Sequence, residues 1–232
     1  MVLNNADVMQ VLREKGVAQL FHANSVLTAC TFLEHGHLLS RARVQSRGLR
    51  QTPQSSDEID KKFGIFDDIF LDGIDIHARA RTKKAPNEYG PVLFVFRMDS
   101  VFADRALQAT LRITRTNPIY WTNEQAEKDR YYSTAQEFAS EYRYGDFQKM
   151  LTFRVPDGQL TLAPSLQQIV IDDPGMPLGE SRALDVAQAA LTTAAGRGGI
   201  NVKVDRRTCS ADCICGRRYA ANWLRLRTMF EV

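Results

Sequence analysis

One uninterrupted apolar run constrains the fold more than any other part of the chain. Residues 91–98 read PVLFVFRM, and every residue from Val92 to Phe96 is apolar. A strand with one solvated face alternates apolar and polar side chains, so an unbroken run indicates a strand that is covered on both faces. We therefore predict a strand in the middle of a sheet, with helices packed on the outer faces of that sheet.

Other strands and helices are predicted on both sides of this run. The segment 41–62 shows no clear period and is predicted to be a surface loop with one helical turn near Ile59. A chain of 232 residues with both predicted strands and predicted helices is expected to form a single α+β domain spanning residues 1–232. Strands are predicted at residues 17–21, 65–71 (continuing at 75–79), 149–155, 160–162, 166–171 and 200–204, and helices at residues 5–16, 26–36, 124–141 and 181–195.

The composition argues against several classes of protein. No apolar run approaches 18 residues, so neither a transmembrane helix nor a membrane partner is predicted. The first residues show no basic segment followed by an apolar one, and four cysteines do not make a disulfide scaffold in a chain of this size. We therefore expect a cytoplasmic protein with reduced thiols. The net charge of +3 is too small to indicate nucleic-acid binding by itself.

A second informative segment reads VAQLFHANSVLTACTFLEHGHLLSRAR (residues 17–43). It begins with a β-prone run that ends at His22, and Asn24 or Ser25 can cap the helix that follows. Gly36 stands where that helix is expected to end. The segment resembles the first NAD-binding motif of the ADP-ribosyltransferases, and it is most like the DarT branch, whose members are toxins that modify nucleic acids.

The resemblance has a second part in residues 144–154, which read YGDFQKMLTFR. In the ADP-ribosyltransferases a glutamate stands at the start of a late strand. It hydrogen-bonds the ribose hydroxyls of the nicotinamide nucleoside and stabilises the positive charge that develops as nicotinamide leaves. Gln148 occupies this position here, and a glutamine keeps the hydrogen-bonding shape but not the negative charge.

Glutamine at this position leaves several alternatives open. The protein can be an enzyme that uses Gln148 or a neighbouring acid, Asp146 or Glu141. It can be a pseudoenzyme that binds NAD without turnover, or a variant inactivated by loss of the glutamate. Gln148 can also be an exposed polar residue at the start of a strand, without any role in chemistry.

The resemblance also implies a fold and a set of site residues. The implied fold is a mixed, split α+β sheet around an NAD cleft, with flanking helices. His22 and Gln148 would be catalytic, NAD would be the ADP-ribose donor, and no metal would be needed; the alternative for His22 is a buried histidine bonded to a carbonyl. The residues implied to bind NAD are His22, Asn24, Ser25, Ser40, Arg41 and Tyr89, with Phe70 and His77 as further candidates beside nicotinamide.

Arginine-rich segments of the chain suggest what kind of molecule accepts the ADP-ribose. Guanidinium groups bind phosphates bidentately, so such segments suit a nucleic-acid backbone or the NAD pyrophosphate. The function implied is transfer of ADP-ribose to a base of single-stranded DNA or RNA, in a toxin–antitoxin or phage-defence system with an antitoxin protein as partner. The competing class is a nucleic-acid-binding or nuclease module without NAD, and a salt-bridged surface is a third explanation. The arginines expected to contact nucleic acid are Arg43, Arg47, Arg50, Arg79 and Arg81.

Two groups of potential metal ligands carry weaker signals. Four aspartates lie along a predicted strand at mixed parity, which favours a solvated strand edge over a magnesium site. Three cysteines near the C-terminus lack an evident fourth ligand, which favours free thiols over a zinc site. These residues are Asp67, Asp68, Asp72 and Asp75, and Cys209, Cys213 and Cys215.

Overall fold

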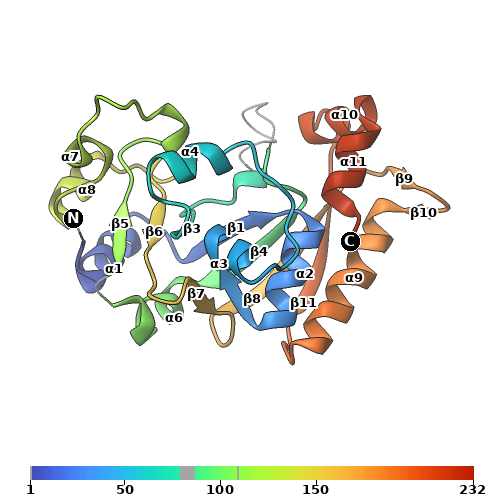
Figure 1. Ribbon diagram of the computed structural model, residues 1–232, viewed down its shortest axis with the longest axis horizontal. Helices are drawn as coiled ribbons and strands as arrows, with labels where there is room; N and C mark the ends of the chain where they lie inside the picture. Colours follow the sequence, from blue (N-terminus) through green and yellow to red (C-terminus); the bar gives the residue numbers. More distant parts are fainter. Residues whose placement is uncertain (1, 79–86, 109) are drawn as a thin grey trace.

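The core of the fold is a four-stranded sheet in the order β1-β4-β8-β11. The computed structural model describes residues 2–78, 87–108 and 110–232. Strand β4 lies inside the sheet, antiparallel to β1 and β8, and β11 is parallel to β8 (Figure 1). The predicted central strand is therefore confirmed. The four strands are β1 (Gln19–Asn24), β4 (Val92–Arg97), β8 (Leu166–Asp173) and β11 (Lys203–Thr208).

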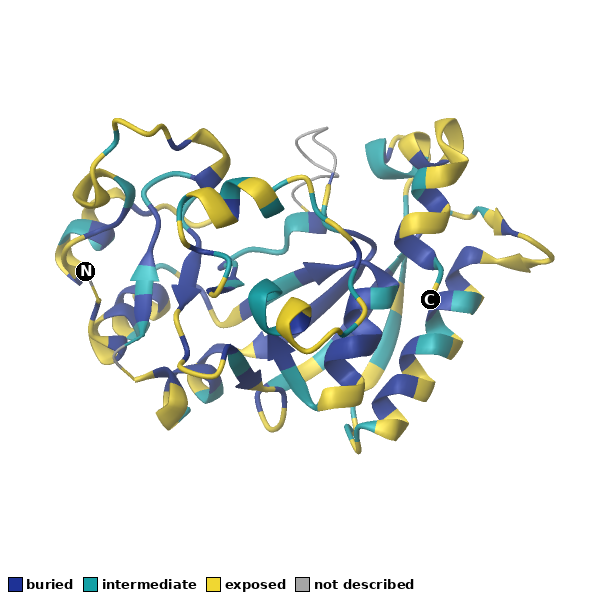
Figure 2. Ribbon diagram, in the orientation of Figure 1, coloured by how far each residue is buried: buried dark blue, intermediate teal, exposed yellow. Residues whose placement is uncertain are grey.

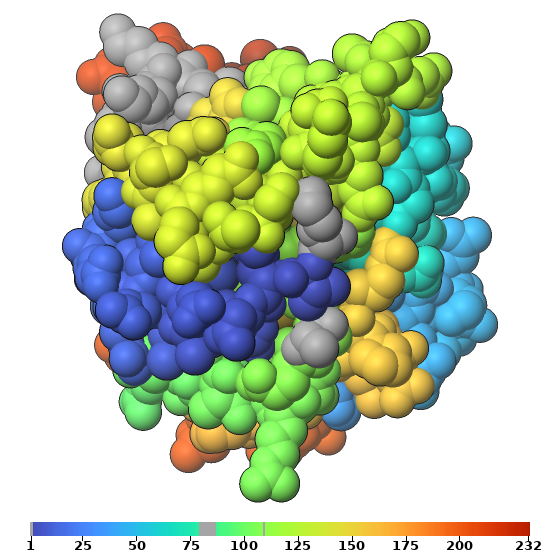
Figure 3. Space-filling view, turned by 90° about the vertical axis from the view of Figure 1, so that its left-hand side faces the viewer, coloured from blue at the N-terminus to red at the C-terminus, as the bar shows by residue number. Residues whose placement is uncertain are grey.

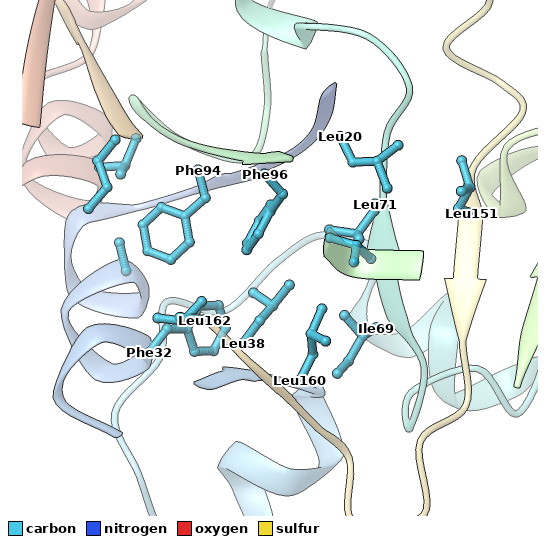
Figure 4. Close-up of a cluster of buried hydrophobic side chains, with 14 of the residues drawn as sticks. Leu20, Phe32, Leu38, Ile69, Leu71, Phe94, Phe96, Leu151, Leu160 and Leu162 are labelled. Atoms are coloured by element: carbon cyan, nitrogen blue, oxygen red, sulfur yellow. The ribbon is translucent and has the colours of Figure 1, made fainter. Parts of the chain in front are cut away.

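Alternate side chains of β4 enter two different apolar clusters. Phe94 and Phe96 lie in the main cluster; Figure 4 shows both on the same side of the strand, with Phe94 pointing towards Phe32 of helix α2 (Val26–His35). Leu93 and Val95 belong to a second cluster on the opposite face, together with residues of β1 and β8. Because both faces exclude water, an unbroken apolar run is the sequence that this position requires.

A second sheet of three strands, in the order β3-β6-β5, stands beside the first. An antiparallel bridge between Phe21 and Asp72 connects the two sheets, through backbone hydrogen bonds of 2.9 Å in each direction. The sheet is thus split, as the resemblance implied. The strands are β3 (Ile69–Leu71), β6 (Leu151–Phe153) and β5 (Leu111–Ile113), and the short pairs are β2 (His37–Leu39) with β7 (Gln159–Thr161) and β9 (Pro177–Leu178) with β10 (Ser181–Arg182).

Helices cover both sheets and turn their exposed residues outwards (Figure 2). Helix α9 (Ala183–Arg197) packs against α2 and β8, while α1 (Asn5–Glu14) packs against α6 and α8 at the far end of the molecule (Figure 3). The other helices are α3 (Arg41–Ser46), α4 (Asp57–Lys62), α6 (Met98–Ala103), α7 (Glu127–Arg130), α8 (Ala135–Glu141), α10 (Ile214–Ala221) and α11 (Trp223–Phe230), with 3-10 turns η1 (Arg105–Leu107) and η2 (Pro118–Tyr120). Among the described residues, no helix is both long and apolar enough to cross a membrane.

Several predicted elements differ from the structure. The segment 41–62 is not a loop throughout, because α3 and α4 form within it; the Ser40 hydroxyl caps α3 by accepting from the Arg43 amide at 3.2 Å. Residues 76–78 are helical rather than a continuation of β3. The Asp75 carboxylate accepts from two following amides and starts this turn, a side-chain contact that apolar periodicity does not reveal.

Substitutions at the end of α9 can test how closely this helix packs against α2. A β-carbon on Gly198 would lie 1.9 Å from the Leu33 carbonyl oxygen of α2, whereas one on Gly196 would meet nothing within 4 Å. We expect Gly198→Ala to lower the free energy of unfolding by about 1–3 kcal/mol. The matched control, Gly196→Ala, should raise it by about 0.5–1 kcal/mol, because alanine favours a helix interior. Urea unfolding of the two variants measures both changes, and equal effects would contradict this packing.

Candidate functional site

A cavity lies where β1 of the four-stranded sheet meets β3 of the three-stranded sheet. It contains about 780 Å³ of empty space, part of which is open to solvent. Its walls include residues of β1, of β3 and the residue after it, of α2, α3 and α4, of the loop before β4 and of η2. We call it the junction cavity. Since these segments are distant in sequence, only the folded chain assembles this site.

His22 presents a neutral imidazole to the junction cavity. Its Nδ1 lies 2.7 Å from the carbonyl oxygen of Phe70 on β3, and because a carbonyl only accepts, Nδ1 carries the proton. Burial lowers the pKa of His22 to about 4, although its hydrogen bonds with the Phe70 carbonyl and the Asn24 side chain act to raise this pKa. At neutral pH the ring is therefore uncharged, and Nε2 is left as its unprotonated nitrogen.

The side-chain amide of Asn24 has a nitrogen, Nδ2, without a hydrogen-bond partner among the described residues. Asn24 is the last residue of β1, its side chain lines the junction cavity, and only 1% of the residue is exposed. A buried donor left unsatisfied costs about 1–3 kcal/mol. A ligand that carries an acceptor at this point would satisfy this donor.

Tyr89 lines the junction cavity from the loop before β4. Burial raises its pKa to about 12, and its hydroxyl group hydrogen-bonds the Asn117 side chain, so the phenol stays protonated. Gly90 allows this loop to approach β1, because a β-carbon there would lie 2.3 Å from the Asn24 carbonyl oxygen. The apolar ring and the polar β1 residues thus share one cavity.

Arg41 lines the junction cavity, but its guanidinium group already has hydrogen-bond partners in the protein. Its guanidinium donates to both carboxylate oxygens of Asp57, at 2.8 and 2.5 Å, and to the Thr52 carbonyl at 3.1 Å. Ser25 and Ser40 do not line the cavity; both hydroxyls cap helices, and Ser25 also bonds Thr52 at 2.6 Å. For these two serines the structure displays a helix-capping role.

Gln148 does not line the junction cavity, although Met150 does. The Gln148 amide donates to Asp146 Oδ1 at 3.0 Å, and its carbonyl accepts from the Thr114 hydroxyl at 2.8 Å. The neighbouring acids, Asp146 and Glu141, also stay outside the cavity, and Glu141 accepts from the Tyr132 hydroxyl at 2.7 Å. The structure thus brings together His22, Asn24, Arg41 and Tyr89, but not Gln148.

Three of the arginines predicted to contact nucleic acid belong to the described residues, and none of them lines the junction cavity. Arg47 and Arg50 are exposed and Arg43 is half-buried. Arg79 and Arg81 lie outside the described residues. Contacts of these arginines with nucleic acid remain a prediction.

The aspartates do not form the solvated strand edge that was predicted. Asp68 is only 2% exposed and is ion-paired with Arg112 and Arg154, while Asp72 lines the junction cavity. His77 is also buried outside the cavity, with Nδ1 2.8 Å from an Asp172 carboxylate oxygen, so it does not share the cavity with Phe70 and Tyr89. Among the described residues, no group of three or more His, Cys, Asp or Glu side chains is arranged to hold a metal ion.

The three C-terminal cysteines gather without forming a disulfide. Cys209, Cys213 and Cys215 are free thiols, and Cys213 hydrogen-bonds each of the other two. Burial raises the pKa values of Cys209 and Cys215. The thiols of Cys209 and Cys215 are therefore protonated at neutral pH and poorly suited to act as nucleophiles.

Comparisons with known proteins identify the fold. No protein-family model and no curated protein sequence matches the chain. Among solved structures, it is similar to Thermus sp. 2.9 DarT in complex with ADP-ribosylated ssDNA, at 10% identity over 83% of this chain and 95% of that chain, with a TM-score of 0.51. The same DarT in complex with carba-NAD+ gives 12% identity over 82% and 96%, with a TM-score of 0.47.

The chain has a DarT-like ADP-ribosyltransferase fold. The predicted α+β fold class and the resemblance noted in the sequence are thereby confirmed. In this DarT-like fold the junction cavity lies at the split between the two sheets.

Several polar residues of the cavity were not predicted as site residues, among them Asp60, Asn117 and Asp72. Asp60 comes from α4, in the segment predicted to be a loop, and Asn117 precedes η2. Asp72 was considered only as a metal ligand or a solvated residue. One signal could have identified it, because Phe70 and Asp72 stand two residues apart in a strand and therefore share a face.

The protonation of Asp72 gives the first test of the cavity. Burial raises the pKa of its carboxyl group from 3.8 to about 7. The folded protein therefore binds this proton more tightly than the unfolded chain, and the associated stability is lost as pH rises from about 4 to about 7. In Asp72→Asn this loss is removed, so the variant should gain stability relative to the wild type across that window, by at most about 1.4 kcal/mol per pH unit.

Urea unfolding of the wild type and Asp72→Asn at several pH values measures this difference. Asp60, with a pKa raised to about 7, and His22, with a lowered pKa, titrate in the same window, but both remain in the two proteins. Their contributions therefore cancel in the comparison. Parallel stability curves would show that Asp72 ionises normally in the folded state.

Proposed function

We propose that this protein transfers ADP-ribose from NAD to a base of single-stranded nucleic acid. The observation that carries the proposal is the junction cavity, which offers a neutral imidazole and an unpartnered amide donor beside an aromatic ring. The DarT structure similar to this chain contains ADP-ribosylated ssDNA, the product of such a transfer. That likeness supports the fold, and the cavity chemistry supports the use of NAD.

The cavity residues suit different parts of NAD. His22 Nε2 can accept a hydrogen bond from a ribose hydroxyl, while Asn24 Nδ2 can donate to a ribose or amide oxygen. The Tyr89 ring offers an apolar surface on which the planar nicotinamide can stack. Arg41 adds positive charge for the pyrophosphate, although Asp57 already shares its guanidinium. In this proposal Ser25 and Ser40 position these groups by capping the helices that follow β1 and β2.

The proposed acceptor is a base of single-stranded DNA or RNA, with Arg43, Arg47 and Arg50 as candidate contacts to the backbone. The proposed setting is a cytoplasmic toxin of a toxin–antitoxin or phage-defence system, held in check by an antitoxin protein. Gln148 is included as a candidate catalytic residue from its position before β6. An NAD-binding pseudoenzyme is the alternative that glutamine at this position favours.

NAD binding tests the proposal directly. Calorimetry should detect binding of NAD to the wild type, and His22→Ala should weaken it by at least about 10-fold, which corresponds to about 1.4 kcal/mol. His37→Ala is the matched control, because His37 lies outside the cavity and its Nδ1 contacts the His35 carbonyl. Absence of binding at millimolar NAD would refute the proposal and favour a nucleic-acid module without NAD.

Salt dependence tests the acceptor. Affinity for a single-stranded DNA oligonucleotide, or for its RNA counterpart, should fall as salt rises, because each neutralised phosphate releases counterions. Arg47→Ala should reduce the slope of log K against log salt by about 0.7 if Arg47 contacts one phosphate. Arg13→Ala serves as control, since Arg13 is on α1 and pairs with Asp99 at 2.9 Å. A protein that fails to bind either oligonucleotide at low salt does not use a nucleic-acid acceptor.

A further inference from the structure

Breaking the bond between ribose and nicotinamide creates positive charge on the ribose. An enzyme accelerates such a step by placing a negative group where the charge develops. Gln148 has no charge and stays outside the junction cavity. The carboxyl groups that line the cavity are therefore the candidates for this role.

Three aspartates line the junction cavity, and two of them already have partners. Asp68 is ion-paired with Arg154 at 2.6 Å and also with Arg112. Asp60 accepts a hydrogen bond from the Ser56 side chain. Asp72 contacts neither a cation nor a hydrogen-bond donor through its carboxyl group, as far as the described residues extend. Burial alone raises its pKa to about 7. An unpaired carboxyl group in a cavity is costly to ionise and typical of functional sites.

The position of Asp72 is fixed by its backbone. Its amide donates to the Phe21 carbonyl, and its carbonyl accepts from the Phe21 amide, both at 2.9 Å. Phe21 immediately precedes His22, whose Nδ1 bonds the Phe70 carbonyl two residues before Asp72. Asp72 and His22 are therefore held on neighbouring strands that face one cavity. A substrate that fills the junction cavity can therefore contact both residues.

We propose that Asp72 is a catalytic residue of the transfer reaction, an inference that rests on the proposed function. The carboxylate stabilises the cationic ribose while the ribose C1′–N bond breaks and its electron pair leaves with nicotinamide. The acceptor nitrogen, or the oxygen of a water molecule, then bonds to C1′. The acceptor loses one proton, which Asp72 takes up and passes to solvent.

Nicotinamide release from NAD tests this role, with and without a single-stranded DNA oligonucleotide that contains all four bases. The assay is run at pH 8, where the Asp72 carboxylate predominates. Asp72→Asn should release nicotinamide at least about 100-fold more slowly than the wild type, while its NAD affinity changes by no more than a few-fold. Asp72→Glu keeps the charge and should retain more activity than Asp72→Asn. Asp67→Asn is the matched control, because Asp67 is exposed and outside the junction cavity.

The outcomes separate this inference from the proposed function. An active wild type whose rate survives in Asp72→Asn overturns the role of Asp72 and leaves the transferase intact. A wild type that binds NAD without releasing nicotinamide also overturns it, and Gln148→Glu would then show whether position 148 needs a carboxylate. A wild type that does not bind NAD removes the proposed function itself. Asp72→Ala replaces Asp72→Asn in the comparison if the asparagine variant does not fold.

Discussion

The arrangement of this protein depends on the antiparallel bridge between Phe21 and Asp72. Its backbone hydrogen bonds, each 2.9 Å long, connect the four-stranded sheet to the three-stranded one. The same strands place His22 beside the carbonyl of Phe70, which fixes the tautomer of the imidazole. The contact that joins the sheets therefore also orients the polar groups of the junction cavity.

Asp68 and Asp72 are close in sequence but differ in their ion pairing, and this difference decides whether the carboxyl group has a structural role or is free to contact a ligand. Asp68, just before β3, is ion-paired with Arg112 of β5 and with Arg154 just after β6, so one carboxylate holds three strands together. Such pairing offsets the cost of removing the charge from water. Asp72 has no comparable partner among the described residues. Its carboxyl group stays available to a ligand, and its high pKa is the physical sign of that difference.

The sequence by itself determined the elements whose signals are local. The apolar run of β4 predicts a covered strand because a strand that excludes water on both faces needs apolar side chains at every position. Helix α2 was bounded correctly by Ser25, which accepts from the Thr28 amide, and by Gly36, whose φ of 67° favours glycine. The resemblance of residues 17–43 also indicated the fold, because that segment combines strand, cap and turn in a fixed order.

Only the tertiary structure decided which of these residues share a cavity. Helix α3 follows from a Ser40 cap rather than from apolar periodicity, and Asp75 turns the chain into a helix through side-chain hydrogen bonds. Both are contacts that a hydrophobic pattern does not encode. Asp72 enters the site, while Gln148 remains outside, because pairing between strands distant in sequence sets the position of each side chain. The sequence supplied the chemical groups, and long-range strand pairing selected those that face the ligand.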